Sequence, residues 1–306
     1  MKKLILLTAF LISVSQFCFA QIEPTRELME FYTPKWEGER EESGRPIVSD
    51  DLLDRLLKLT IEEAWGVLRG EGYHNQFESG WEMVNDKPFV GRALTVLYSP
   101  NRPEIKEQIE ALGKKQGRIG PSNSWPIDML KERDVYVADG FGKVINGTLI
   151  GDNLGNSVYA KSKTGVVLDA GARDVEGLSE IEGFNAFVRG FDPTFIMEMT
   201  VTGINVPVTI GKAAVVPGDV VLAKREGVIF IPAHLVQKVV ITGEFIGLRD
   251  KFGHQMLKEG VYTPGQIDTK WTDEIRQAFL KWLDENEDSL PMSRKELDEY
   301  MKNRTW

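Results

Sequence analysis

Two short segments of this 306-residue sequence combine residue types that can bind a small anion and a metal ion. The first, residues 151–155 (GDNLG), is a polar loop that we expect to lead into a helix, where free backbone amides can hold an anion. The second, residues 170–176 (AGARDVE), follows an apolar run that is typical of a buried strand. Within it, Arg173 offers a planar fork suited to a carboxylate, and Asp174 offers hard oxygen ligands suited to Mg²⁺.

The position of these two residues strengthens the prediction. We expect Arg173 and Asp174 at the carboxyl end of a strand and at the start of a helix, which is the edge of an open α/β sheet where ligands bind. In this site, backbone amides and Arg173 would hold an anion, and Asp174 would hold a metal. A simpler interpretation stays open, in which Asp174 caps the helix and Arg173 forms a surface ion pair.

Apolar, β-branched runs alternate with helical stretches through the middle of the chain. Strands are expected at 90–98, 134–140, 165–171, 184–190, 204–210, 215–216 and 220–230. Helices are expected at 103–115, 151–163 and 174–181. This order predicts an α/β layered domain over roughly residues 86–235, in which Pro217-Gly218-Asp219 forms a tight turn between two strands.

The flanks of the chain have a different character. Residues 21–48 are polar and interrupted by Pro and Gly, which indicates a surface arm or linker, and a helix is expected after Ser49. Thr60 and Glu63 fit a capping box, as do Ser293 and Glu296. After Pro232 the chain is predicted to be helical, first over 235–251 and then along an aromatic stripe over 271–282. We interpret this stripe as core packing, with a partner-binding face as the alternative.

Composition excludes several classes of protein. Hydrophobic residues make up 42% of the chain and charged residues 27%, which excludes a disordered chain and a multi-span membrane protein. The formal net charge of −9 argues against nucleic acid as a partner, because phosphate binding needs clustered Lys and Arg. The three histidines, His74, His234 and His254, are too widely spaced to suggest a zinc site.

The first 20 residues resemble a cleaved signal peptide. Met1-Lys2-Lys3 precedes an apolar run that ends at Ala20, so we expect an exported protein, periplasmic or secreted, with no membrane attachment after cleavage. A lipoprotein signal at Cys18 and an uncleaved anchor are the alternatives. Because Cys18 is the single cysteine, the mature chain would contain none, which excludes disulfides and thiolate chemistry.

Several blocks in one order carry a resemblance to a known family. They are residues 90–96 (VGRALTV), 134–140 (DVYVADG), 151–154 (GDNL), 166–174 (VVLDAGARD), 187–190 (FVRG), 206–208 (VPV), 217–223 (PGDVVLA) and 227–232 (GVIFIP). Over about residues 50–250 the chain resembles the RraA-like family. That family includes regulators of ribonuclease E activity and metal-dependent aldolases of 4-hydroxy-4-methyl-2-oxoglutarate and 4-carboxy-4-hydroxy-2-oxoadipate.

The resemblance implies a fold, an assembly and a division of the chain. The fold is an α/β layered sandwich with a swivelling β/β/α-type core, assembled as a homotrimer or homohexamer with the active site in a cleft between subunits. On this basis the chain divides into a signal peptide (1–20), an N-terminal arm (21–48), an RraA-like α/β domain (49–250) and a C-terminal helical extension (251–306).

The resemblance also implies site residues. Arg173 and Asp174 match the catalytic Arg-Asp pair of the aldolases, in which the Asp binds Mg²⁺ or Mn²⁺. The substrate-binding residues would be Gly151, Asn153 and Leu154 through their amides, Asp152 as a supporting carboxylate, and Arg173 itself. Glu176 would be the acidic residue that follows the pair. Asp250 or Glu244 is a candidate for the carboxylate that a neighbouring subunit contributes, with solvated helix charges as the alternative.

The implied function is a divalent-metal-dependent aldolase that cleaves a small 4-hydroxy-2-oxo acid to pyruvate. Oxaloacetate decarboxylation would pass through the same enolate. The chain differs from the family in having Lys224 where an Asp is usual, and in its extra terminal segments. A non-enzymatic RraA-like binding protein is therefore the alternative. A Schiff-base aldolase is disfavoured because Lys161 and Lys163 lie in a polar stretch, and a methyltransferase is disfavoured because its glycine-rich loop is missing.

Overall fold

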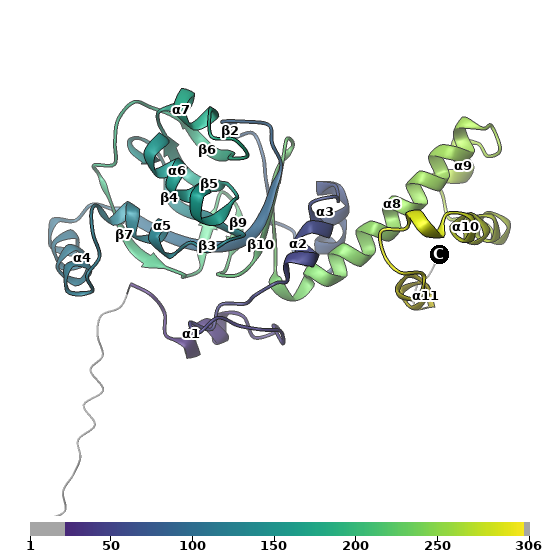
Figure 1. Ribbon diagram of the computed structural model, residues 1–306, viewed down its shortest axis with the longest axis horizontal. Coiled ribbons are helices and arrows are strands. Elements are labelled where there is room, and N and C mark those ends of the chain that lie inside the picture. The colour runs from purple at the N-terminus through teal and green to yellow at the C-terminus, as the bar shows by residue number, and fades with distance from the viewer. Residues whose placement is uncertain (1–21, 303–306) are drawn as a thin grey trace, which may run out of the picture.

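The computed structural model describes residues 22–302 and contains a rounded α/β body from which a helical module projects (Figure 1). The expected signal peptide therefore lies outside the described residues. The strands are β1 (Phe77–Glu78), β2 (Glu82–Met83), β3 (Phe89–Pro100), β4 (Asp134–Ile150), β5 (Val166–Ala172), β6 (Ala186–Phe191), β7 (Met199–Ile204), β8 (Val208–Ile210), β9 (Ala213–Val215), β10 (Val220–Lys224) and β11 (Gly227–Ile231). The helices are α1 (Arg26–Tyr32), α2 (Asp50–Leu56), α3 (Ile61–Gly70), α4 (Pro103–Lys115), α5 (Trp125–Met129), α6 (Asp152–Ser162), α7 (Val175–Ser179), α8 (Val236–Lys258), α9 (Pro264–Ile267), α10 (Asp273–Glu285) and α11 (Arg294–Lys302).

One large sheet forms the centre of the body, in the order β1-β11-β10-β3-β4-β5-β6-β2, with β7 added to the edge of β3. The pairs β3–β4, β4–β5 and β5–β6 are parallel, whereas β10 and β11 pair antiparallel at one side. The short hairpin of β8 and β9 forms a second, separate sheet. The expected strand over 204–210 is thus divided between β7 and β8, with Asn205-Val206-Pro207 between them.

Both faces of the central strands are covered, which is why their sequences read as nearly continuous apolar runs. On one face, Tyr136 and Leu168 pack with Val158 of α6 and Leu178 of α7. On the other face, Val137 and Val167 pack against the hairpin of β8 and β9 through residues such as Ile210 and Val215. The sheet, the hairpin and the helices therefore form the predicted β/β/α sandwich.

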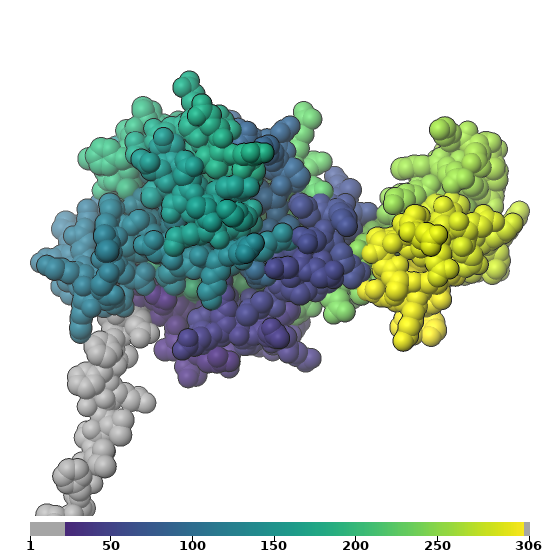
Figure 2. Space-filling view, in the orientation of Figure 1, coloured from purple at the N-terminus to yellow at the C-terminus, as the bar shows by residue number. Residues whose placement is uncertain are grey.

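The terminal segments form two further cores. The helices α2, α3 and the first half of α8 pack over β10 and β11 around Leu53, Leu68 and Val239. Beyond them, the second half of α8 packs with α10 and α11 around Phe252 and Phe279, which confirms that the aromatic stripe is core. Helix α8 extends seven residues past its predicted end at Lys251, because Phe252 continues its buried face into this module. Figure 2 shows the module as a separate lobe.

Local sequence signals act as expected at several helix starts. The hydroxyl of Thr60 accepts the amide of Glu63, and the Glu63 carboxylate accepts the amide of Thr60, so the predicted capping box is formed. At the start of α11 only half of the predicted box is formed: the hydroxyl of Ser293 accepts the amide of Glu296 at 3.2 Å, whereas the Glu296 carboxylate pairs with Arg55 at 3.3 Å. None of the helices within residues 22–302 has both the length and the apolar character needed to cross a membrane.

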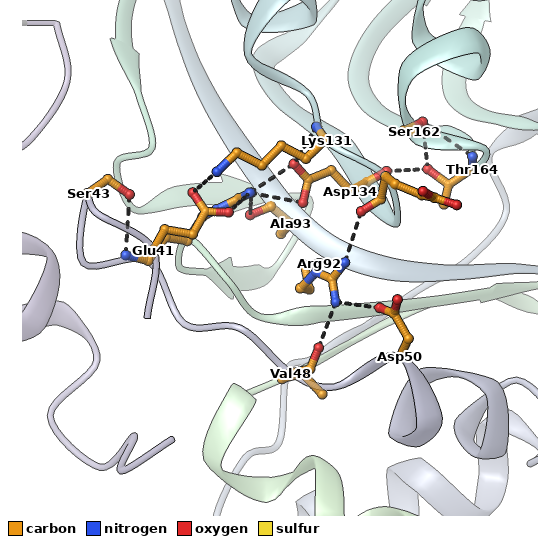
Figure 3. Close-up of polar contacts among 12 residues, drawn as sticks. Glu41, Ser43, Val48, Asp50, Arg92, Ala93, Lys131, Asp134, Ser162 and Thr164 are labelled. Carbon is orange, nitrogen blue, oxygen red and sulfur yellow. Dashed lines mark hydrogen bonds and ion pairs between the residues drawn. The ribbon is translucent and has the colours of Figure 1, made fainter. Parts of the chain in front are cut away.

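The N-terminal arm is held on the body by buried charges, not left as a free linker (Figure 3). The guanidinium of Arg45, which is 1% exposed, donates to both carboxylate oxygens of Asp134 at 2.8 and 3.0 Å and to Glu41 at 2.7 Å. Arg92 donates to the carbonyl of Val48 at 2.7 Å and to Asp50 at 2.8 Å, which fixes the end of the arm against β3. The ion pair between Arg45 and Asp134 thus joins residues 89 positions apart.

Removing Asp134 leaves the guanidinium of Arg45 buried with Glu41 as its remaining carboxylate partner. We expect Asp134→Asn to lower the free energy of unfolding by about 3 kcal/mol, measured by urea denaturation. Glu30→Ala, which breaks the exposed pair with Arg26, serves as the control and should change it by about 0.5 kcal/mol or less. Equal effects of the two substitutions would show that the buried pair does not hold the arm.

The turn before β10 contains a second buried acid. Gly218 has a φ of +86°, as the predicted Pro217-Gly218-Asp219 turn requires, and Oδ2 of Asp219 accepts the amide of Val216 at 2.9 Å. Burial raises the pKa of the Asp219 carboxyl from 3.8 to about 7, and the amides of Val216 and Ala233 oppose this only in part. The folded protein therefore binds this proton more tightly than the unfolded chain does.

Stability should decrease as this carboxyl ionises. The neutral Asp219 carboxyl makes its full contribution to stability below its pKa in the unfolded chain, near 4. This contribution is lost as the pH rises towards its pKa in the folded protein, about 7. We expect the unfolding free energy of the parent protein, relative to Asp219→Asn, to fall by about 2–3 kcal/mol between pH 5 and pH 8. Chemical denaturation of both proteins across this range measures the difference, and a constant value would contradict the assignment.

Candidate active site

The two segments singled out in the sequence meet at one edge of the sheet. Strands β4 and β5 are parallel, and their last paired residues are Ile150 and Ala172. Gly151 follows the first strand and Arg173 follows the second, and the amide of Arg173 donates to the carbonyl of Ile150 at 3.0 Å. The carboxyl ends of parallel strands thus bring residues 151–154 and 173–174 side by side, as predicted.

Gly151 is the point of closest approach between the segments. A Cβ atom placed on it would lie 2.2 Å from Oδ2 of Asp174 and 3.2 Å from Cγ of Arg173. Its φ of −129° is open to any residue, so the requirement for glycine here comes from space and not from backbone conformation. The Asp174 carboxylate therefore lies directly against the backbone at the start of α6.

Asp174 itself has a strained backbone. Its φ of 54° and ψ of 45° place it in the left-handed region, which is uncommon for residues other than glycine. Although Asp174 occupies the residue before α7, its side chain makes no capping hydrogen bond. The interpretation of Asp174 as a helix cap is therefore wrong, and the carboxylate is available for another role.

Arg173 and Asp174 remain accessible. Their closest charged atoms, Nη1 and Oδ2, are 3.5 Å apart, and the two side chains are 41% and 37% exposed. The ion pair in the simpler interpretation thus exists, but it joins the two candidate residues to each other. Because the contact is longer than a hydrogen bond and half open to solvent, it leaves both groups free to bind a ligand.

Two adjoining hollows open at this edge. The larger, about 350 Å³, is lined by Asn123, Gly151, Asn153, Leu154, Arg173 and Phe195, among others. The smaller, about 270 Å³, is lined by Arg173, Asp174, Val175, Phe191, Asp192 and Pro193. Arg173 borders both hollows, so one side chain links the start of α6 with the hollow that Asp174 lines.

The start of α6 is only partly free to bind an anion. The first backbone bond of the helix runs from the amide of Gly155 to the carbonyl of Gly151 at 2.8 Å, which leaves the amides of residues 152–154 outside the helical ladder. The amide of Asn153 donates instead to Oδ1 of Asp152 at 2.7 Å. Asp152 also lies close to α7, because a Cβ on Gly177 would be 2.8 Å from its Cβ.

Sequence reasoning missed Asp192. This residue directly follows β6, whose last residue, Phe191, pairs with Ala172, so Asp192 is level with Arg173. Hydrogen bonds from the hydroxyl and amide of Thr194 hold the pKa of Asp192 below its ordinary value. Its signal in the sequence is the one that marks Arg173, because Asp192 comes shortly after the end of the expected strand 184–190.

Other expected residues lie elsewhere. Glu176 is exposed on α7 and lines neither hollow. Glu244 is not a solvated helix charge, because its side chain is 4% exposed and accepts two hydrogen bonds from Arg55 at 2.6 and 2.9 Å. Asp250 is exposed on α8. Lys161 and Lys163 are exposed, as their polar surroundings predicted.

The donor set fits a metal that is shared with a ligand. Within residues 22–302, no three His, Cys, Asp or Glu side chains come together to form a metal site of protein ligands alone. Mg²⁺, however, keeps several waters and commonly uses one or two carboxylates together with oxygens of the substrate. The accessible carboxylate of Asp174, with ionised Asp192 nearby, meets that requirement.

Comparison with known proteins agrees with this architecture. The model of the RraA-like family, described as Aldolase/RraA, matches residues 48–230. A protein of Alcanivorax borkumensis named "Putative 4-hydroxy-4-methyl-2-oxoglutarate aldolase" is 26% identical over 148 residues, which is 48% of this chain and 80% of that protein.

Two solved structures share the fold. An uncharacterized protein from Pseudomonas syringae pv. tomato has a TM-score of 0.61 and 20% identity over 76% of this chain and 98% of its own. Streptomyces coelicolor RraAS2, described as an unusual member of the RNase ES inhibitor RraA protein family, has a TM-score of 0.55 and 22% identity over 73% and 98%.

The backbone of Asp174 provides a test of the site geometry that is independent of activity. Because glycine adopts a positive φ without a Cβ clash, we expect Asp174→Gly to be about 1 kcal/mol more stable than Asp174→Ala. At Glu176, on the regular helix α7, the order should reverse, with alanine the more stable by about 0.5–1 kcal/mol. Thermal unfolding of the four variants measures both orders, and the same order at both positions would contradict the strained backbone.

Proposed function

Because this chain belongs to the RraA-like family, we propose that it is a divalent-metal-dependent aldolase that cleaves a 4-hydroxy-2-oxo acid to pyruvate. The observation that carries the proposal is the convergence of Arg173, Asp174 and the start of α6 on one pair of hollows. A guanidinium, a carboxylate and helix-terminal amides are the groups needed to hold a cation and an anionic keto acid together.

Arg173 is suited to the carboxylate of the substrate. Its planar fork can form two parallel hydrogen bonds with a carboxylate, and it borders both hollows. The larger hollow, at about 350 Å³, has the size expected for a small organic acid. The amides of Asp152 and Leu154 lie outside the helical ladder, so they add favourable partial charges beside the same anion.

Asp174 would hold a Mg²⁺ or Mn²⁺ ion together with oxygens of the bound acid. When bound, the metal supplies a Lewis acid that stabilises the charge developing on the 2-oxo oxygen. Asp192 remains ionised beside Asp174 and adds negative charge where a divalent cation would be attracted. Gly151 lets the Asp174 carboxylate approach the backbone, which fixes its position relative to Arg173.

Arg173 also contributes to the chemical step. Cleavage of the C3–C4 bond, after a base removes the proton of the C4 hydroxyl, leaves negative charge on the enolate of pyruvate. A guanidinium that holds the carboxylate next to this enolate stabilises the charge without reorganising. Loss of carbon dioxide from oxaloacetate produces the same enolate, so we propose oxaloacetate decarboxylation as a second activity of the site.

The proposal extends to assembly and location. Phe141, Ile145, Phe195 and Met197 are 43–63% exposed, and Phe195 lines the larger hollow. Exposed apolar groups beside a site favour contact between protein subunits, which supports a homotrimer or homohexamer. The signal-like residues 1–20 support export to the periplasm or beyond.

The experiment is a pyruvate-coupled assay over a panel of 4-hydroxy-2-oxo acids and oxaloacetate. We expect pyruvate release with Mg²⁺ or Mn²⁺, its loss with EDTA, and a fall in kcat of about 10²-fold or more in Asp174→Ala. Glu180→Ala, an exposed residue at the end of α7, is the control and should retain activity. If folded, metal-loaded protein releases no pyruvate from any of these acids, the non-enzymatic binding protein becomes the better proposal.

A further inference from the structure

A second cavity, of about 310 Å³, lies between the N-terminal arm and the body. The arm contributes Tyr32 and Trp36, and the segment after α3 contributes Tyr73 and Gln76. The turn before β10 supplies Asp219 to the same cavity. The residues matched by the family model begin at 48, so the arm side of this cavity lies outside them.

This cavity is separate from the candidate active site. Val220, which follows Asp219, pairs with Arg92, and Arg92 pairs with Asp134, the first residue of β4. Asp219 is therefore near the amino ends of the parallel strands, whereas Arg173 follows the carboxyl end of β5. The two sites lie at opposite ends of the parallel strands and share no lining residue.

The walls of the cavity suit a flat ring. Tyr32, Trp36 and Tyr73 supply three aromatic side chains, and the remaining walls are mainly apolar residues such as Pro34 and Pro232. Aromatic side chains bind another ring by offset stacking or by edge-to-face contact. A volume of about 310 Å³ is at the lower end of the range for ligand pockets, which indicates a ligand with a single ring.

The buried polar groups of the cavity can accept hydrogen bonds. Gln76, 8% exposed, donates through Nε2 to the carbonyls of Ala214 and Phe230 at 3.1 and 3.2 Å, which fixes its carboxamide. Within residues 22–302 no group donates to its Oε1. Asp219, 3% exposed, lies in the same lining. A hydroxyl group on the ligand would donate its one hydrogen bond to Oε1 of Gln76, since the Asp219 carboxyl already accepts the amide of Val216.

The arm side of the cavity carries a cation. Lys35 is exposed and forms no ion pair with any residue of the described part of the chain, whereas the nearby Glu71 is paired with Lys238. His234 also lines the cavity, and burial, reinforced by the charge of Lys35, lowers its pKa. His234 is therefore neutral near pH 7, and Lys35 is the group that can bind a carboxylate.

We propose that this cavity binds a monocyclic aromatic carboxylic acid that carries a phenolic hydroxyl. The ring lies among Tyr32, Trp36 and Tyr73, the hydroxyl donates to Gln76, and the carboxylate pairs with Lys35. A sugar acid of similar size fits less well, because its several hydroxyls need more partners than the largely apolar walls offer. Since the arm supplies two of the rings and the cation, the bound acid joins the arm to the body.

Calorimetric titration of the full chain with 4-hydroxybenzoate tests the proposal. We expect binding in the micromolar to millimolar range, at least tenfold weaker binding by benzoate, and weaker binding still by D-glucuronate. Lys35→Met should weaken binding about tenfold or more, and Trp36→Leu should weaken it further. The matched controls, Lys58→Met and Trp65→Leu, change exposed residues that do not line the cavity and should bind as the parent does.

Several outcomes would overturn the proposal. These are the absence of 4-hydroxybenzoate binding at millimolar concentration, equal or tighter binding of D-glucuronate, and equal effects of Lys35→Met and Lys58→Met. Loss of binding in Arg173→Met would also overturn it, because the acid would then occupy the candidate active site. Lys35 is exposed, so its substitution should leave the fold intact even if Trp36→Leu does not. The test is independent of the pyruvate assay.

Discussion

Parallel pairing between the ends of β4 and β5 is the interaction on which the candidate active site depends. The amide of Arg173 donates to the carbonyl of Ile150, so the chain leaving one strand lies beside the chain leaving the other. Between Asp139 and Ile150, β4 advances by many more residues than β5 does between Asp169 and Ala172, because the register shifts on either side of the pairs that Lys143 and Thr148 form. The pairing nevertheless continues to Ile150 and Ala172, and this places Gly151 against Asp174.

The close packing at this edge explains why several residues there have small side chains or unusual backbone angles. A side chain at Gly151 would collide with the Asp174 carboxylate, and one at Gly177 would collide with Asp152. Asp174 adopts a left-handed conformation that α7 does not require for capping. Backbone strain of this kind costs of order 1–3 kcal/mol and is found most often at functional sites, where surrounding structure maintains it.

The segments outside residues 48–230, which the family model matches, are attached to the body by buried charges and by apolar packing. Arg45 fixes the arm through Asp134, and Arg55 joins α2 to α8 through Glu244. Desolvation makes such pairs a weak source of stability but a strong constraint on which segments can meet, because an unmatched charge would be buried alone. Arg45 and Arg92 hold residues 40–50 against β3 and β4, and the preceding arm residues 32–36 line the cavity beneath the arm.

The sequence by itself determined the layered α/β core, most helix boundaries, the capping box at Thr60 and the aromatic core of the C-terminal helices. These features depend on neighbours three or four positions apart, or on alternation along one strand, so they can be recognised locally. Its ordered motifs also identified the family and placed Arg173 and Asp174 after a strand. Only the tertiary structure decided that Asp174 does not cap α7, that Asp192 borders the same hollow and that Glu244 is buried with Arg55. Those outcomes depend on contacts between distant segments, 189 residues apart for Arg55 and Glu244, and no local pattern encodes the register that brings them together.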